Sequence, residues 1–245
     1  MIKKNLLFIC ICLICKFTLS GQNIVVTERN KAFQVFKKQK EFYYIEKDFP
    51  LTDERWLATL EGFCTNTTKS NPEQLFYDLW KKANKMGANA FFIKDFSNTT
   101  DSIFVTVSIF NLTEEQLDDN YELYSCNKIY VFGDLIVSNF KTKTPKSRSF
   151  KINKEKIKVY PLSYYEYQSD IGEKVNVSIG GLFGSSYTRT GEARKKSIYL
   201  SFSGETIKPE INPMPMGGVG VRFSAKSIYL LDMNFGQFLV EILKR

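Results

Sequence analysis

Apolar and polar residues alternate over several short stretches of the chain, a spacing that predicts β-strands with one buried face. The clearest case is residues 103–110, where Ile103, Val105 and Val107 occupy every second position. Three further strands are expected in the first half of the chain, at residues 56–64, 90–96 and 127–132. We expect the strands at residues 56–64, 90–96 and 103–110 to flank the clearest helix of the chain.

That helix is expected over residues 72–86, where apolar side chains recur every three or four positions. Asn71 can cap its first turn, and Pro72 suits the first helical position because an N–H there would have no partner within the helix. Gln74 completes a capping-box spacing, and Gly87 is suited to the positive φ that often follows a last turn. The apolar face of this helix should pack on a sheet.

After residue 160 the helical spacing gives way to short alternating runs separated by Gly, Pro and Asn. Strands are expected at residues 175–179, 198–203 and 219–223, and residues 235–243 are interpreted as a last strand rather than a terminal helix. The expected fold class is α+β, with a small strand-helix-strand-strand domain followed by a mainly antiparallel β-domain.

The start of the chain has the composition of a secretory signal peptide. Lys3 and Lys4 form a positive beginning, residues 6–14 are continuously apolar, and Gly21 is a small residue at the expected cleavage site before Gln22. Because the apolar run is shorter than the about 20 residues of a spanning helix, no transmembrane segment is expected.

Export would remove three of the five cysteines and leave Cys64 and Cys126. A cysteine pair in an oxidising compartment is a disulfide candidate, and two separately buried thiols are the alternative. Lipidation of Cys15 is disfavoured because Ile14, the residue before it, is not small.

Basic residues are concentrated in one stretch of the mature chain. Loss of Lys3, Lys4 and Lys16 lowers the 34 Lys and Arg residues to 31 against 26 Asp and Glu, so the net charge falls from +8 to +5. The candidate surface-binding residues of the basic stretch are Lys141, Lys143, Lys146, Arg148, Lys151, Lys154, Lys156 and Lys158.

This stretch also indicates how the chain is divided. We expect a signal peptide at residues 1–21, an α+β domain at 22–136, a basic linker at 137–160 and a β-rich domain at 161–245. In an exported protein, exposed basicity favours an envelope protein or an anionic envelope surface as partner and disfavours nucleic acid. A solvated linker without a binding role is the alternative interpretation.

The chain has no histidine, which excludes Ser-His-Asp triads, Cys-His pairs and histidine metal ligands. No metal or cofactor is expected, and carboxylate pairs are the remaining catalytic option. The densest acidic pairs are Glu114 with Glu115 and Asp118 with Asp119, on a helix expected over residues 113–123. Adjacent helical side chains diverge by about 100 degrees, so neither pair aims both carboxylates at one substrate.

A resemblance is carried by Lys81-Lys82-Ala83 and Met86-Gly87-Ala88-Asn89-Ala90. The segment resembles the helix-to-strand element of a small α+β domain shared by bacterial YbjQ-type proteins and the Rcs stress-sensing outer-membrane lipoprotein of enterobacteria. The resemblance covers residues 54–134 and implies an envelope role without catalysis, and some of those relatives are disulfide-stapled. Within the motif, Asn89 is expected to bond its own backbone.

The overall composition and the Gly-Gln-Asn junction at residues 21–23 also resemble those of uncharacterised exported proteins of the Bacteroidetes. The expected protein is therefore a non-catalytic, exported cell-envelope protein that acts by protein or surface binding, alone or within an envelope assembly. Its expected location is the periplasm or the periplasmic face of the outer membrane. The alternative is a histidine-free, carboxylate-dependent glycan hydrolase.

Overall fold

The computed structural model describes residues 24–33, 35, 39–65, 71–99, 102–135, 147–180, 184–203 and 227–243 of the chain. In this part, three α-helices and thirteen strands form three mostly antiparallel sheets. The predicted mixed α+β class is confirmed, and strands predominate. The predicted signal peptide and the strand expected at residues 219–223 lie outside the described residues.

The first sheet has the strand order β1-β3-β5-β4-β2. Its strands are β1 (Val25–Arg29), β2 (Tyr43–Tyr44), β3 (Trp56–Cys64), β4 (Ala90–Asn98) and β5 (Ile103–Phe110), and the 3₁₀ turn η1 (Asp53–Arg55) precedes β3. The predicted alternation in β5 is confirmed, because Ile103, Val105 and Val107 are fully buried.

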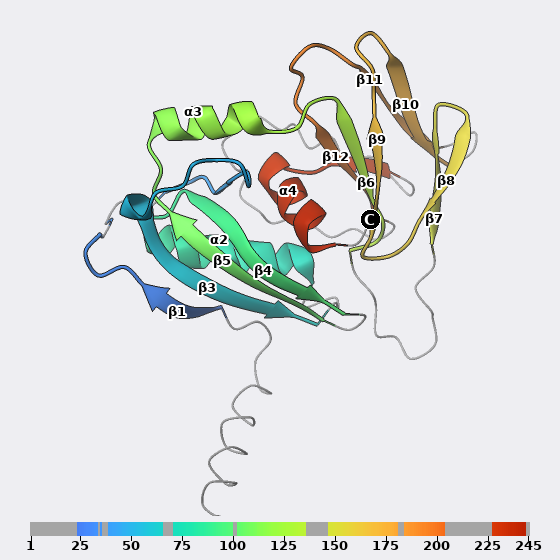
Figure 1. The fold of residues 1–245 in the computed structure, drawn as a ribbon. Helices are drawn as coiled ribbons and strands as arrows, with labels where there is room; N and C mark the ends of the chain where they lie inside the picture. The colour runs from blue at the N-terminus through green and yellow to red at the C-terminus, as the bar shows by residue number, and fades with distance from the viewer. Residues whose placement is uncertain are drawn as a thin grey trace, which may run out of the picture.

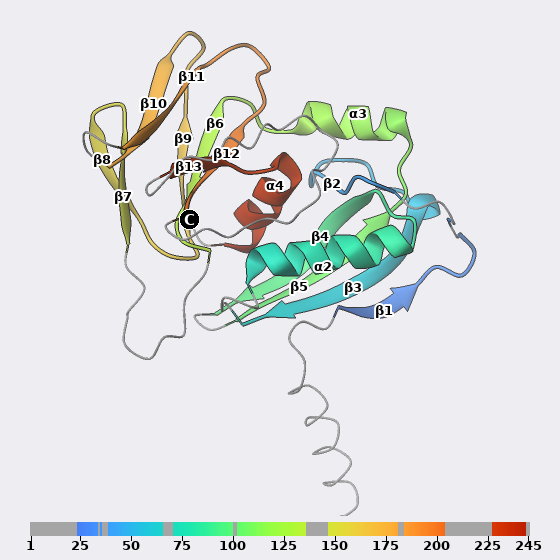
Figure 2. The ribbon, with the colours of Figure 1, turned by 180° about the vertical axis from the view of Figure 1, so that it is seen from behind.

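Helix α2 (Pro72–Lys85) covers one face of this sheet (Figure 2). It begins as predicted, because Oδ1 of Asn71 accepts a hydrogen bond from the backbone N–H of Gln74 at 3.0 Å. The side chain of Gln74 donates to Oδ1 of Asp78, one turn further along the helix, at 3.1 Å. Leu79 lies on the buried face of the helix, which packs on the sheet as expected.

The turn from α2 into β4 is tight. Gly87 has a φ of 82°, and a Cβ atom there would lie 2.7 Å from Cβ of Val35. Ala88 is fully buried beside it. The expected bond of Asn89 to its own backbone is not the one that its side chain makes. The side chain instead donates to the carbonyl of Leu112 and accepts from the N–H of Leu112, each at 2.8 Å. This pair of bonds joins the turn to the segment that follows β5.

Two four-stranded sheets form the rest of the described chain, with the orders β11-β10-β7-β8 and β13-β12-β6-β9. Their strands are β6 (Lys128–Phe132), β7 (Arg148–Ile152), β8 (Glu155–Val159), β9 (Tyr164–Gln168), β10 (Lys174–Ile179), β11 (Ser185–Thr190), β12 (Ile198–Ser203) and β13 (Ser227–Leu230). Apolar side chains of both sheets pack into a second core cluster. Strand β6, which the sequence analysis assigned to the first domain, pairs with β9 and β12, so a boundary at residue 136 does not separate the sheets.

The interpretation of residues 137–160 as a linker is wrong for residues 148–159, which form the β7–β8 hairpin. Phe150, Ile152 and Val159 of this hairpin are buried in the second core cluster. These apolar residues alternate with lysines, so a strand signal was present, and the high lysine content concealed it.

Residues 235–243 do not form the expected strand, because they belong mainly to helix α4 (Met233–Ile242). The side chain of Asp232 caps the helix by accepting a hydrogen bond from the N–H of Phe235 at 3.0 Å. Phe235, Phe238 and Leu239 follow helical spacing and are buried. Helix α4 lies between the first sheet and the β6–β12 region (Figures 1 and 2).

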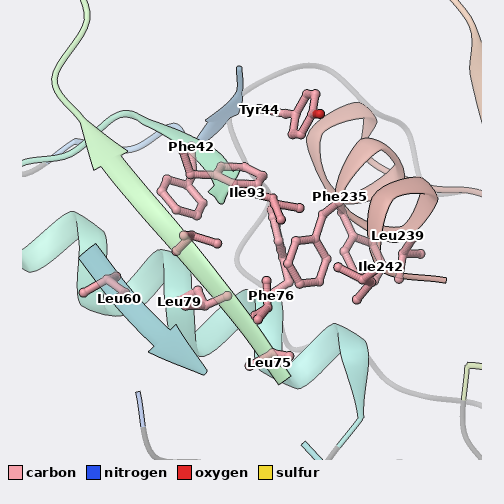
Figure 3. Packing of buried hydrophobic residues seen from close by; sticks show 14 of the residues in the cluster. Phe42, Tyr44, Leu60, Leu75, Phe76, Leu79, Ile93, Phe235, Leu239 and Ile242 are labelled. Atoms are coloured by element: carbon pink, nitrogen blue, oxygen red, sulfur yellow. The ribbon is translucent and has the colours of Figure 1, made fainter. Parts of the chain in front are cut away.

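Helix α4 joins the two halves of the molecule through one hydrophobic core. In Figure 3, Phe235, Leu239 and Ile242 of α4 lie beside Phe76 of α2. The ring centroids of Phe76 and Phe235 are 5.2 Å apart. The same core cluster includes Tyr199 of β12, so both halves contribute to a single buried volume.

Helix α3 (Glu114–Leu123) begins at the expected cap. The N–H of Gln116 donates to the hydroxyl of Thr113 at 3.3 Å, and the N–H of Thr113 donates to Oε1 of Gln116 at 3.0 Å, which completes a capping box. The four acidic residues singled out on this helix are exposed to solvent: Glu114, Glu115, Asp118 and Asp119.

Candidate functional site

The hairpin β7–β8 presents lysines on the outward face of the β11-β10-β7-β8 sheet. Side chains alternate between the two faces of a strand, and Phe150 and Ile152 point into the second core. Lys151 of β7 therefore points outward. In β8, the same alternation buries Val159 and places Lys156 and Lys158 outward.

Lys151 and Lys156 are direct cross-strand partners. Directly opposed side chains on one face have Cβ atoms about 5 Å apart, so the two ammonium groups share one small region of surface. Lys158 is paired with Ser149 one step further along the hairpin. Like charges in directly opposite positions destabilise a strand pair, which makes this arrangement unfavourable in the absence of an anion.

Strands β10 and β11 extend the same face with another lysine and with hydroxyl groups. Ser178 of β10 is the partner of Lys151, and Lys174 of β10 is the partner of Thr190 in β11. Asn176 lies between them and donates to the hydroxyl of Thr188 at 2.8 Å.

We call this surface the basic sheet face. Its outward residues are Ser149, Lys151, Lys156, Lys158, Lys174, Asn176, Ser178, Ser186, Thr188 and Thr190. No Asp or Glu occupies an outward register position of these four strands, and none of the four lysines forms an ion pair within the described part of the chain. The face can therefore offer several ammonium and hydroxyl donors to an anionic ligand.

The structure places the predicted surface-binding residues in different positions. Lys151, Lys156 and Lys158 meet on the basic sheet face, and Lys154 lies exposed in the turn between β7 and β8. Arg148 is turned to the other side of β7, where its Nε donates to both carboxylate oxygens of Asp134 at 3.0 Å. The remaining predicted residues, Lys141, Lys143 and Lys146, lie outside the described residues.

Lys174 belongs to the face but was missed by the sequence analysis. It begins β10, which pairs with β7 across more than twenty intervening residues. The alternation of Val175, Val177 and Ile179 predicted the strand and placed Lys174 on its polar side. Only the pairing of β10 with β7 brings that lysine to the same sheet face as Lys151, whose partner Ser178 lies four residues further along β10.

The structure does not join the two cysteines of the candidate disulfide, Cys64 and Cys126, to each other. Cys64 is fully buried in the first core cluster, on the side of β3 that α2 covers. Cys126 is partly exposed beside Lys196, and its Sγ lies 3.6 Å from the carbonyl oxygen of Tyr124. The alternative of two separately buried thiols holds for Cys64 alone.

The most perturbed carboxylate is Glu46, which the sequence analysis did not single out. Its Oε1 accepts a hydrogen bond from Nε2 of Gln237 in α4 at 2.8 Å. Burial, together with the negative charges of Glu241 and Asp48, raises the pKa of Glu46 from 4.5 to about 7. Glu241 is itself paired with Lys47 at 2.7 Å. Both carboxylates are thus engaged by groups of the same chain.

Metal-ligating groups do not gather in the described residues, where no cluster of three or more Cys, Asp or Glu side chains has metal-binding geometry. No helix in the described ranges has both the length and the apolar composition required to span a membrane. Comparisons of the chain with protein families, with curated proteins and with solved structures found no match.

Proposed function

We propose that this protein is a non-catalytic, exported protein of the cell envelope that binds an anionic envelope surface through the basic sheet face. The proposal is carried by one observation, the direct opposition of Lys151 and Lys156 on an exposed face without outward acidic residues. Their repulsion is relieved when an anionic group lies between or above the two ammonium groups.

The strands hold the backbone of this face in place before binding, so little chain entropy is lost when an anion arrives. A lysine near an anionic surface contributes about 1 kcal/mol. The four lysines Lys151, Lys156, Lys158 and Lys174 therefore supply about 4 kcal/mol, which corresponds to a dissociation constant of about 1 mM. Binding of that strength is reversible and is strongly weakened by salt.

The predicted signal peptide supports the envelope as the compartment. In the periplasm, phosphate and carboxylate groups of lipids and glycans provide the anionic surface that the lysines require. The hydroxyls of Ser149, Ser178 and Ser186 add neutral donors to the same ligand groups. Periplasmic residence is part of the proposal.

Cosedimentation of the mature chain, from Gln22 onward, with lipid vesicles tests this function. We expect binding to phosphatidylglycerol vesicles, little binding to phosphatidylcholine vesicles, and loss of binding as the salt concentration rises. The double substitution Lys151→Gln/Lys156→Gln should weaken binding to the anionic vesicles by about tenfold or more, since it removes about 2 kcal/mol.

The matched control removes an equal number of positive charges, two, from α2. Lys81→Gln/Lys85→Gln alters exposed lysines on a different element and should leave vesicle binding nearly unchanged. Equal losses in the two variants would contradict a specific basic sheet face. Turnover of a glycan that Glu46→Gln abolishes without unfolding the protein would instead favour the carboxylate-dependent hydrolase.

A further inference from the structure

The face of the first sheet opposite α2 and α4 is partly exposed. Both helices pack on the inner face, which carries Val105 and Val107, and Figure 1 views the sheet from the other side. Part of this outer face, around Ala90 and Phe110, is covered by a third small core cluster that includes Phe49. The end of the face that carries Phe63, Phe104 and Val25 has no such cover among the described residues.

Three apolar side chains are exposed together at that end. Phe63 of β3 and Phe104 of β5 are direct cross-strand partners, 42% and 36% exposed. Val25 of β1, 42% exposed, is the partner of Glu61, two residues before Phe63. Exposed aromatic side chains that lie side by side on a sheet mark interaction surfaces more often than isolated ones do.

Acidic residues lie on the same face, to one side of the two phenylalanines. Glu61 lies between the positions of Thr59 and Phe63 on the outer face of β3, and the register also places Glu28 of β1 and Asp95 of β4 outward. No Lys or Arg is paired at an outward position in the registers of β1, β3, β4 and β5. Lys94, the residue before Asp95, lies in a bulge of β4 and has no partner in the register.

We infer that this surface, the acidic aromatic face formed by Val25, Glu28, Glu61, Phe63, Asp95 and Phe104, docks a basic amphipathic helix of a partner protein. The apolar stripe of such a helix covers the two phenylalanines, and its flanking Lys or Arg side chains lie opposite the carboxylates. Helix α2 packs in the same manner on the inner face, so the partner helix completes a helix-sheet-helix sandwich.

Charge decides against the other occupants of this face. A second copy of the chain, docked face to face, would bring Glu61 and Asp95 against their own equivalents, and like charges at an interface oppose association. An anionic lipid surface is repelled by the same carboxylates. A cationic partner gains from both the carboxylates and the exposed rings, because cations also bind aromatic faces.

This inference goes beyond the proposed function, since it concerns a different sheet and a ligand of opposite charge. If both hold, the protein links an anionic surface to a basic partner protein through two separate faces. The basic sheet face and the acidic aromatic face share no residue, so substitutions can remove either one alone.

Fluorescence anisotropy with a synthetic helical peptide tests the inference. The probe has the 14-residue length of α2, with a leucine stripe flanked by lysines, and a second probe has glutamate at each lysine position. We expect the basic probe to bind the mature chain and the acidic probe not to bind. Phe63→Ser/Phe104→Ser and Glu61→Gln/Asp95→Gln should each weaken binding of the basic probe about tenfold, corresponding to about 1.4 kcal/mol.

Helix α3 supplies the matched controls. Glu114→Gln/Glu115→Gln removes two exposed carboxylates, and Leu123→Ser removes a side chain that is 45% exposed; neither should change peptide binding. Equal weakening by the control and test variants would overturn the inference. The inference would also be overturned if the protein self-associated in sedimentation velocity, or bound vesicles, and Phe63→Ser/Phe104→Ser abolished that association or binding. The proposed function fails separately, through the vesicle test of Lys151→Gln/Lys156→Gln.

Discussion

Gly236 of α4 lies directly against the ring of Tyr199 in β12, where a Cβ atom on the glycine would be 2.1 Å from Cγ of the ring. That distance is far below van der Waals contact, so only glycine allows the helix to approach the strand this closely. Tyr199 in turn stacks on Tyr130 with ring centroids 5.2 Å apart. The contact is the point at which α4 joins the second half of the molecule.

Gly236→Ala should therefore destabilise the protein, although alanine favours a helix. Overpacking against the buried ring costs about 1–3 kcal/mol, whereas the helical preference of alanine returns at most about 1 kcal/mol. We expect a net loss of about 1–2 kcal/mol in the free energy of unfolding, measured with urea. In the Tyr199→Ala background the same substitution should become neutral or stabilising, and an equal loss in both backgrounds would show that the ring is not the cause.

Asn120 should be the most sensitive residue of α3. Its side chain is buried, accepts from the N–H of Glu46 at 2.9 Å and donates to the carbonyl of Tyr44 at 2.8 Å. Asn120→Ala leaves the N–H of Glu46 without this partner and removes one of two donors to the carbonyl of Tyr44, which also accepts from the hydroxyl of Tyr124. We expect this to cost about 1–3 kcal/mol of unfolding free energy. The neighbouring exposed Asp119→Ala is the control, and comparable losses for the two variants would contradict this account.

Glu46 makes stability depend on pH between about 4.5 and 7. Because burial raises the pKa of Glu46 in the folded protein to about 7, the neutral form is favoured by folding. The stability that Glu46 contributes is fully present below its unfolded pKa of 4.5 and is lost as the pH rises through its folded pKa of about 7. We expect the free energy of unfolding of the wild type to fall by about 2 kcal/mol over this range relative to Glu46→Gln, since partial exposure screens the charge.

The measurement is chemical unfolding of both proteins at a series of pH values. Glu46→Gln retains an oxygen that can accept from Gln237, so the hydrogen bond to α4 is kept while the titration is removed. Parallel pH profiles for the two proteins would contradict the assignment to Glu46.

The two cysteines should differ in reactivity. Cys126 is partly exposed and should react with a thiol reagent in the folded protein, whereas Cys64 is fully buried and should react only after unfolding. Mass spectrometry of the alkylated peptides distinguishes the two sites. A mobility difference with and without reductant, or protection of both thiols in the folded protein, would instead support the disulfide.

Local signals in the sequence predicted the elements that local interactions determine. The cap at Asn71 and the alternation through Val105 identified α2 and β5 correctly. Helix α4 was misinterpreted because the apolar run from Phe235 fits a strand when its length is considered alone. The spacing of Phe235, Phe238, Leu239 and Ile242 carried the helical period.

Long-range pairing could not be predicted in the same way. The lysines of the basic sheet face were found in the sequence except for Lys174, whose position depends on the pairing of β10 with β7. The burial of Cys64 depends on which face of β3 meets α2, a tertiary fact that sequence spacing does not contain. The buried environment of Glu46 forms only when the chain folds and Gln237 of α4 donates to its carboxylate.

Lysine footprinting tests the central claim most directly. The mature chain is acetylated with and without phosphatidylglycerol vesicles, and the modified lysines are quantified by mass spectrometry. We predict that Lys151, Lys156, Lys158 and Lys174 become protected while Lys81 and Lys85 of α2 keep their reactivity. Uniform protection of all these lysines, or protection of the α2 pair alone, would contradict binding through the basic sheet face.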